Sequence, residues 1–111
     1  MKIHEDAVIL RIFFGEHDRH NGKPIYKLIV MKAKELKLAG ATVIKGLMGF
    51  GAKSHLHTSN ILTLSENLPV IVEIVDCKEN IEKLLPFLDE TIEDGLITME
   101  DVKIIKYSIK K

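Results

Sequence analysis

Apolar residues gather into four strand-like segments that alternate with two segments of helical periodicity. Residues 7–14 form a near-continuous apolar run bounded by Gly15, which is typical of a buried strand. Residues 41–47 and 68–75 are rich in β-branched side chains, and a last strand is predicted over residues 102–107. The pattern therefore predicts four strands and two intervening helices.

Proline and glycine delimit the first helix. Pro24 suits the first position of a helix, and apolar side chains follow it at helical spacing. Gly40 is expected to end this helix. The apolar stripe comprises Ile25, Leu28, Ile29, Ala33 and Leu36.

The second helix has a similar stripe, and its ends are marked by different residues. Asp76 with Glu79 is expected to cap its start, and Gly95 is expected to end it. Pro86 lies inside the stripe, so we expect it to kink the helix or split it in two. The apolar stripe comprises Ile81, Leu84, Leu85, Leu88 and Ile92.

The order β-α-β-β-α-β predicts an α+β domain with the ferredoxin-like fold, a four-stranded antiparallel sheet with two helices on one face. Right-handed crossovers place the first and third strands side by side at the centre. Residues 61–64 alternate enough for a short arm or hairpin return. With 111 residues, the chain is expected to form one domain, residues 1–111.

Both faces of the two central strands are apolar, although the helices can cover only one face. An uncovered apolar face predicts an association surface, and hence a homo-oligomer built through the sheets. Arg11 and Glu73 are the polar exceptions on that second face. They lie on neighbouring strands, so we expect them to pair as a structural ion pair at a subunit interface rather than to act in catalysis.

Composition narrows the class of partner. Lys and Arg number 16, as do Asp and Glu, so the chain lacks the basic surplus of a nucleic-acid-binding protein. The single cysteine, Cys77, excludes an internal disulfide and fits a reducing cytoplasm. No apolar run reaches the roughly 18 residues of a membrane span, and the N-terminus lacks signal-peptide features. A cytoplasmic protein is expected.

The stretch 46–58 carries the strongest chemical signal. It leaves a predicted strand through Gly46, Gly49 and Gly51, and it contains a lysine, two histidines and two hydroxyls. Glycines let backbone N–H groups approach a ligand closely, which is the chemistry of phosphate or nucleotide capture. The spacing matches neither the P-loop nor the dinucleotide fingerprint.

A charged loop, residues 15–23, precedes the first helix. It is either a solvated turn or a set of hydrogen-bonding groups at a helix N-terminus, where anions are favoured. Lys23 would add positive charge, and Glu16 could bind a ribose hydroxyl or an amine. This loop and the glycine-rich stretch need not share one end of a subunit, and they could meet across an oligomer interface.

Two further chemistries are open from these residues. His55 and His57 lie on the same side of an extended segment and could chelate a metal, which gives the alternative interpretation of a metal-binding protein. Cys77 starts a helix, where the dipole lowers a thiol pKa, but no base is reliably placed beside it, which favours a buried thiol. A nucleotide hydrolase is disfavoured because no general base has a partner.

Three segments together resemble the uncharacterised PII-like family, whose members are short cytoplasmic proteins classed as a domain of unknown function. The resemblance covers almost the whole chain. Against PII signalling proteins themselves, residues 43–55 are similar to the entry of the long T-loop and residues 72–75 to the third strand. The three segments are residues 10–19 with Gly22 and Pro24, residues 40–43 with Gly49, Phe50, Gly51 and His57, and residues 68–76.

The resemblance implies a ferredoxin-like homotrimer that binds adenine nucleotides in clefts between subunits and signals by moving its T-loop, here residues 51–65. It places residues 49–53 at the T-loop entry, residues 73–75 near the adenine, and residues 95–98 in the phosphate-contacting B-loop. The residues expected at the nucleotide are Glu16, Lys23, Gly46, Gly49, Phe50, Gly51, Lys53, His57, Glu73, Ile74, Val75, Gly95 and Thr98.

Departures from the PII pattern refine the expected ligand. Residues 95–101 are acidic where PII proteins are basic and glycine-rich, which favours AMP or ADP over ATP. No tyrosine lies between Gly51 and Pro69, so the modification site of bacterial PII proteins is absent. The expected function is a non-enzymatic sensor without a cofactor, whose partner could be a membrane transporter or channel. The alternative is a metal-binding trimer that uses His55 and His57.

Overall fold

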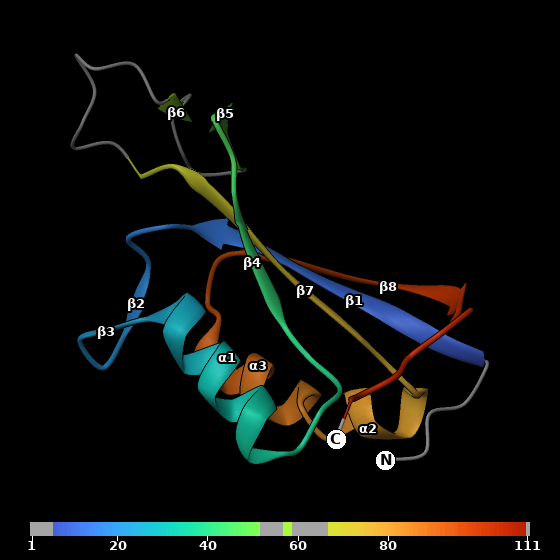
Figure 1. The fold of residues 1–111 in the computed structure, drawn as a ribbon. Helices are drawn as coiled ribbons and strands as arrows, with labels where there is room; N and C mark the ends of the chain where they lie inside the picture. Colours follow the sequence, from blue (N-terminus) through green and yellow to red (C-terminus); the bar gives the residue numbers. More distant parts are fainter. Residues whose placement is uncertain (1–5, 52–56, 59–66, 111) are drawn as a thin grey trace.

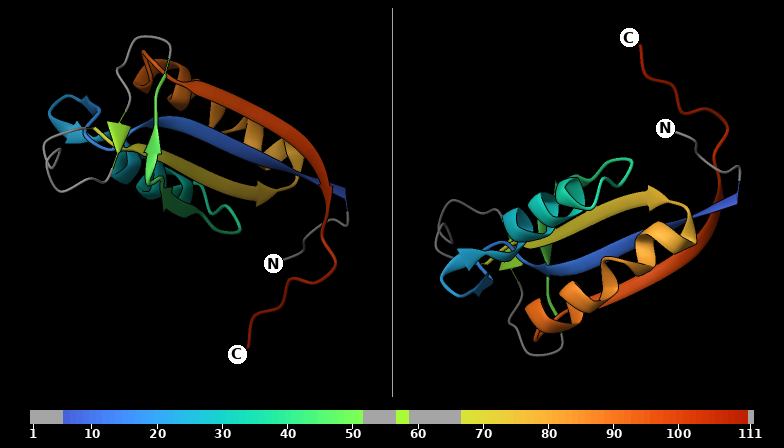
Figure 2. Two further views of the ribbon diagram at one scale, coloured as in Figure 1. Left: turned by 90° about the horizontal axis from the view of Figure 1, so that it is seen from above. Right: turned by 90° about the horizontal axis from the view of Figure 1, so that it is seen from below.

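A computed structural model describes residues 6–51, 57–58 and 67–110 and forms an antiparallel sheet with helices on one face (Figures 1 and 2). The strands lie in the order β4 (Thr42–Lys45), β7 (Pro69–Asp76), β1 (Asp6–Gly15) and β8 (Leu96–Lys103). The helices are α1 (Ile25–Glu35), α2 (Lys78–Glu82) and α3 (Leu85–Thr91). Two short hairpins pair β2 (Arg19–His20) with β3 (Lys23–Pro24) and β5 (Met48–Gly49) with β6 (His57–Thr58).

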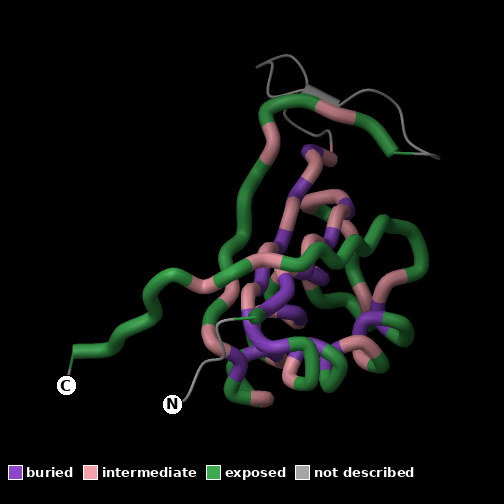
Figure 3. Tube along the Cα trace, turned by 90° about the vertical axis from the view of Figure 1, so that its right-hand side faces the viewer, coloured by how far each residue is buried: buried purple, intermediate pink, exposed green. Residues whose placement is uncertain are grey.

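This arrangement confirms the predicted ferredoxin-like fold. The first and third long strands, β1 and β7, are paired at the centre of the sheet. Alternate residues of both strands face the helices and are buried, and buried positions gather between the two layers (Figure 3). The core comprises Val8, Leu10, Ile12, Phe14, Val70, Val72 and Ile74 from these strands, Ile25, Ile29, Ala33, Ile81 and Leu88 from the helices, and Leu38 and Leu84 from the connections.

The second face of the sheet carries the expected ion pair. Arg11 Nε lies 2.9 Å from Glu73 Oε2, and Arg11 Nη1 lies 3.7 Å from Glu100 Oε1. The hydrogen bond that Arg11 donates to Glu73 outweighs desolvation and raises the pKa of Arg11. The predicted pairing is therefore confirmed within one chain, because the register sets these residues directly opposite each other.

The first helix ends earlier than predicted. It stops at Glu35, and Lys37 takes a left-handed conformation with φ of 61°. The Leu38 N–H then donates to the Ala33 carbonyl, which closes the last turn. Gly40 was therefore wrongly assigned as the helix stop, and it lies instead in the connection to β4.

The second helical segment is divided as Pro86 predicted, into α2 and α3. The predicted capping pair is wrong, because Cys77 is the N-cap residue of α2 and no side chain caps it. Asp76 is 1 % exposed, and its carboxylate accepts from Ala39, Cys77 and Asn80 rather than pairing with Glu79. Gly95 does not end the helix either: α3 ends at Thr91.

The last strand was predicted too late in the chain. β8 begins at Leu96 and ends at Lys103, so the predicted B-loop at Gly95–Thr98 is wrong for residues 96–98, which are paired with β1. Nearly every residue of β8 is exposed, because it is an edge strand that the helices barely cover. It therefore lacks the burial pattern that reveals central strands.

The predicted arm at residues 61–64 lies outside the described residues. No helix in the described part of the chain is long and apolar enough to cross a membrane.

Candidate functional site

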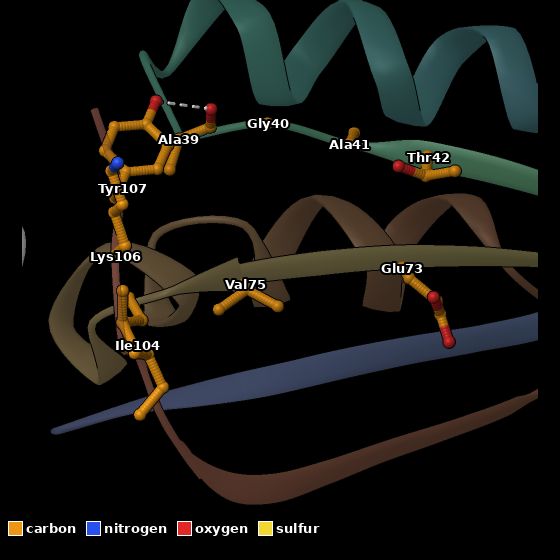
Figure 4. A pocket seen from close by; sticks show the side chains of 10 residues that line it. Ala39, Gly40, Ala41, Thr42, Glu73, Val75, Ile104, Lys106 and Tyr107 are labelled. Carbon is orange, nitrogen blue, oxygen red and sulfur yellow. Dashed lines mark hydrogen bonds between the residues drawn. The ribbon is translucent and has the colours of Figure 1, made fainter. Parts of the chain in front are cut away.

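An open groove of about 570 Å³ lies on the sheet face away from the helices, at the start of β4 (Figure 4). A volume of this size suits a small-molecule ligand. The walls come from the α1–β4 connection, from β7 and from the C-terminal segment that follows β8. The lining residues are Ala39, Gly40, Ala41, Thr42, Glu73, Val75, Ile104, Ile105, Lys106 and Tyr107.

One wall of the groove is built from small residues. Ala39, Gly40 and Ala41 leave their backbone close to the surface, and a Cβ built on Gly40 would have no heavy atom within 4 Å. Backbone N–H and C=O groups in such a wall can recognise the edge of a flat polar ring. This wall therefore gives a ligand close access to the backbone of Gly40 and Ala41, whereas the polar groups of Ala39 are already bonded within the chain.

The Ala39 peptide is held from two directions. Its N–H donates to Asp76 Oδ2 at 2.9 Å, and its carbonyl accepts from the Tyr107 hydroxyl at 2.9 Å. Asp76 Oδ1 accepts from the Cys77 N–H at 2.7 Å and from Asn80 Nδ2 at 3.0 Å. The buried carboxylate thus joins the groove wall to the start of α2.

The β7 side of the groove supplies Glu73 and Val75. Both side chains point to the face away from the helices, where Val75 is half-buried. Since Arg11 occupies Glu73 Oε2, the other carboxylate oxygen is left as an acceptor for a hydroxyl or amino group.

The C-terminal segment forms the remaining wall. Ile104, Lys106 and Tyr107 reach from the end of β8 to the α1–β4 connection (Figure 4). The hydrogen bond from Tyr107 to Ala39 closes this span. Lys106 adds a positive charge beside the groove, where it could face an anionic ligand.

The charged loop and the glycine-rich stretch lie at one end of the same subunit. Lys45 Nζ, at the end of β4, lies 2.9 Å from Glu16 Oε2, just after β1. β1 and β4 both run antiparallel to β7, so their C-terminal ends lie at the same end of the sheet. The two features therefore meet within one subunit, an arrangement that the sequence left open beside a meeting across an oligomer interface.

Asp18 and Asn67 fix the loop that follows β1. Asp18 Oδ2 accepts from the Gly15 N–H at 2.9 Å, and Asp18 Oδ1 accepts from Asn67 Nδ2 at 2.8 Å. Asn67 also accepts from the His17 N–H. Hydrogen bonds from Asp18 and Asn67 therefore hold this loop in a defined turn.

Residues 46–51, which follow β4 and are called the arm below, contain glycines with a packing role. A Cβ on Gly46 would lie 2.8 Å from Pro69 Cγ, and one on Gly49 would lie 3.0 Å from the same atom. The Gly46 N–H donates to the Pro69 carbonyl at 2.7 Å. Gly46 therefore has no free N–H for a phosphate, and its small size is explained by the close approach to β7.

Replacing Gly46 by alanine should destabilise the fold by about 1–2 kcal/mol, since the new methyl group would overpack against the Pro69 ring. Chemical denaturation measures this free energy. The same change in a Pro69→Ala background should cost much less. Equal costs in the two backgrounds would contradict the packing role.

The structure divides the predicted nucleotide residues between several places. Glu73 and Val75 line the groove, whereas Ile74 is 1 % exposed and faces the core, so its side chain cannot reach a ligand there. Thr98 lies opposite Arg11 in β8. The others lie toward the opposite end of the sheet or beyond it: Glu16, Lys23, Gly46, Gly49, Phe50, Gly51 and Gly95.

Two predicted residues are not placed in full. Lys53 lies outside the described residues. His57 is described in its backbone, where β6 sets it opposite Gly49. The metal-binding alternative rests on this histidine and on His55, which lies outside the described residues; in the part that the structure describes, no cluster of three His, Cys, Asp or Glu side chains could hold a metal.

The sequence pattern did not predict that Ala39–Thr42 form the wall of a groove or that Tyr107 binds it. Gly40 was interpreted as a helix stop and Tyr107 as part of a strand. Cys77 behaves as the buried thiol that was favoured: burial raises its pKa, opposite to the helix-dipole effect. It stays protonated near neutral pH and is a poor nucleophile.

Comparison with known proteins gives a family and a fold. The family model DUF190, described as "Uncharacterized ACR", matches residues 7–104. A UPF0166 protein of Aquifex aeolicus is 40% identical over 97 residues, which cover 87% of this chain and 91% of the relative. Another, from Methanocaldococcus jannaschii, is 43% identical over 101 residues, 90% of this chain and 93% of the relative.

Solved structures extend the likeness to the fold. CPII, a nitrogen regulatory PII-like protein from Thiomonas intermedia K12, bound to ADP, AMP and bicarbonate, matches with a TM-score of 0.61 and 12% identity, over 91% of this chain and 90% of that chain. The same protein bound to ADP, AMP and acetate matches with a TM-score of 0.57, 13% identity and the same coverage. The resemblance to uncharacterised PII-like proteins is confirmed.

Proposed function

Because the chain belongs to the DUF190 family and has a PII-like fold, we propose that it is a non-enzymatic sensor that binds AMP or ADP in clefts of a homotrimer. The groove beside Glu73 and Val75 carries this proposal. It lies on the strand where the resemblance to PII proteins expects the adenine. Structures of CPII with this fold are bound to ADP and AMP, which supports the same ligand class here.

In this proposal the adenine lies against Val75 and the backbone of Gly40 and Ala41. An aromatic ring gains from the apolar floor and from hydrogen bonds to main-chain groups. Glu73 accepts a hydrogen bond from a ribose hydroxyl through the oxygen that Arg11 leaves open. The groove therefore recognises the adenosine end of the ligand.

The phosphates extend along β4 toward the arm. Lys45 is opposite Val70 and Thr42 is opposite Glu73. These two pairs are three residues apart, which is about 10 Å by the rise of a β-strand. A diphosphate directed along β4 therefore approaches Lys45, and the arm at Gly49, Phe50 and Gly51, of the same subunit or of its neighbour, lies beyond it.

Binding regulates a partner through the arm and residues 51–65. The arm exposes Leu47, Met48 and Phe50, which are 76%, 60% and 74% exposed. A ligand changes what these side chains present only if it contacts one arm conformation better than another. A membrane transporter or channel is the class of partner that the PII-like resemblance suggests, with the protein itself in the cytoplasm.

Calorimetric titration of the purified chain with AMP, ADP and ATP tests the proposal. We expect saturable heat at one site per chain for AMP or ADP and weaker binding of ATP. Replacing Glu73 by glutamine should weaken binding about tenfold, because a charged acceptor becomes a neutral one. No heat and no thermal shift with any of the three nucleotides would overturn the proposal.

A further inference from the structure

Charge is divided between the two halves of the helix layer, although the chain as a whole is neutral. Figure 2 shows α1 on the side of β4 and β7, and α3 on the side of β1 and β8. Residues 19–37, which include α1, contain six basic residues and one acidic residue. Residues 76–101, which include α2 and α3, contain nine acidic and two basic residues. An anionic surface is therefore attracted by the α1 half of the layer and repelled by the other half.

Lys27, Met31 and Lys34 form the outward face of α1. They are spaced by four and three positions, so they share one side of the helix, opposite the buried Ile29. All three are exposed, and Met31 is 67% exposed. Lys37 is exposed just after the helix. The three lysines and Met31 are called the α1 surface below.

The three lysines of the α1 surface form no ion pair with any described residue. Lys32 lies on another side of α1, where its Nζ is 5.7 Å from the centre of the Phe87 ring of α3. It is also 3.6 Å from Oε1 of Glu35, so the one acidic residue of α1 is partly neutralised already. The α1 surface therefore presents three positive charges that are available to an external partner.

The composition of the α1 surface indicates the class of partner. It contains lysine and methionine but neither arginine nor an aromatic residue, whereas protein interfaces are depleted in lysine and depend on arginine and aromatic anchors. Lysine is a hydrated point charge on a flexible stem, so it suits an anionic layer without fixed geometry. The headgroups of anionic phospholipids form such a layer, and an apolar side chain between the lysines can enter its boundary with the acyl chains.

We propose that the α1 surface binds the anionic headgroups of a phospholipid bilayer, with α1 parallel to the membrane. Lys27 and Lys34 are two helical turns apart, about 10 Å, so both reach the same headgroup layer. Each lysine adds about fivefold to the partition onto an anionic membrane, so three lysines add about 100-fold at low salt. The acidic half of the helix layer turns away from the bilayer, which fixes the orientation of the bound protein.

This binding goes beyond the proposed function and does not depend on it, since the α1 surface is present without nucleotide. The helices cover one face of the sheet (Figure 1), so assembly through the opposite face leaves the α1 surface open to a membrane. Membrane binding is therefore measured without nucleotide. Its failure and a failure of nucleotide binding can be told apart in separate experiments.

Co-sedimentation with vesicles tests the proposal. Vesicles of equal parts phosphatidylglycerol and phosphatidylcholine are compared with vesicles of phosphatidylcholine alone. We expect the parent chain to bind the anionic vesicles about tenfold more strongly or better, and to leave them when salt is raised from about 50 mM to about 500 mM. The triple variant Lys27→Gln, Lys34→Gln and Lys37→Gln should lose this preference, and circular dichroism verifies that it is folded.

The matched control is the triple variant Lys78→Gln, Lys83→Gln and Lys103→Gln, which removes three lysines from the acidic side of the molecule. It has the same net charge as the first variant, so a difference between the two locates the attraction at α1. We expect it to bind the anionic vesicles within about twofold of the parent chain, because its changes lie away from the membrane.

Tryptophan fluorescence gives a second readout, because the chain contains no tryptophan. Met31→Trp places one reporter in the α1 surface, and Glu90→Trp places one at an exposed position of α3. On anionic vesicles we expect a blue shift for Met31→Trp alone. A parent chain that does not bind anionic vesicles, or equal losses in the two triple variants, would overturn the proposal. Soluble polyglutamate that displaces the chain from vesicles at an equal concentration of negative charge would also overturn it, in favour of an acidic protein partner.

Discussion

Replacing Gly40 by leucine should abolish ADP binding while leaving the fold intact. Gly40 lines the groove, and a Cβ at this position would meet no heavy atom within 4 Å. Its backbone needs no positive φ, so a side chain adds no strain. The isobutyl group would instead occupy space that the adenine requires. We expect the Kd to rise at least about 100-fold, equivalent to about 3 kcal/mol.

Glu90→Leu is the matched control for this change, because it adds the same side chain at an exposed position of α3 away from the groove. It should bind ADP with the affinity of the parent chain. Calorimetry measures binding, and thermal denaturation verifies that both variants are folded. A folded Gly40→Leu chain that binds ADP normally would place the ligand elsewhere.

Replacing Asp76 by asparagine should cost about 2–4 kcal/mol of stability. Both carboxylate oxygens accept hydrogen bonds from donors: Ala39 on one side, Cys77 and Asn80 on the other. Asparagine has a single acceptor oxygen and an NH₂ group, so one side of the buried site would set a donor against a donor. For a domain of this size, the Tm should fall by about 10 °C or more.

Tyr107→Phe provides the comparison for Asp76. It removes the other hydrogen bond of the Ala39 peptide, but this bond is exposed, so its loss should cost less than about 1 kcal/mol. Denaturation of the two variants under the same conditions measures the difference. Similar, small costs for both would show that the buried carboxylate does not hold the groove wall.

The central strands could be predicted because burial imposes a pattern on them. In β1 and β7 alternate residues face the helices, so apolar residues recur with strand periodicity and Gly15 marks the end of the first run. Pro86 likewise divides the second helix by removing a backbone donor. These features follow from local chemistry and need no knowledge of distant residues.

The outer strand β8, the end of α1 and the α1–β4 connection were predicted less well, because contacts with distant residues define them. β8 is a strand through its pairing with β1, and its own side chains are nearly all exposed. The first helix ends where Lys37 takes a left-handed conformation. Lysine has no preference for this conformation, so its presence in the sequence does not predict the helix end. The α1–β4 connection forms a groove wall only because Asp76 and Tyr107 bind Ala39 from remote parts of the chain.

The glycine-rich arm shows how one residue type supports two explanations. Glycine permits close approach to a phosphate and equally to another backbone. The structure assigns Gly46 to the second role, through Pro69. The adenosine end of the ligand is therefore proposed to bind in the groove, where Glu73 and Val75 are found, with the arm toward the phosphates.

A crystal structure of the protein in complex with ADP tests most directly the central claim that the groove binds the adenosine end of the nucleotide. We expect the adenine between Val75 and the backbone of Gly40 and Ala41, with the ribose at Glu73 and the phosphates directed toward the arm. Clear density for ADP at any other surface, or an empty groove at saturating ADP, would contradict the account.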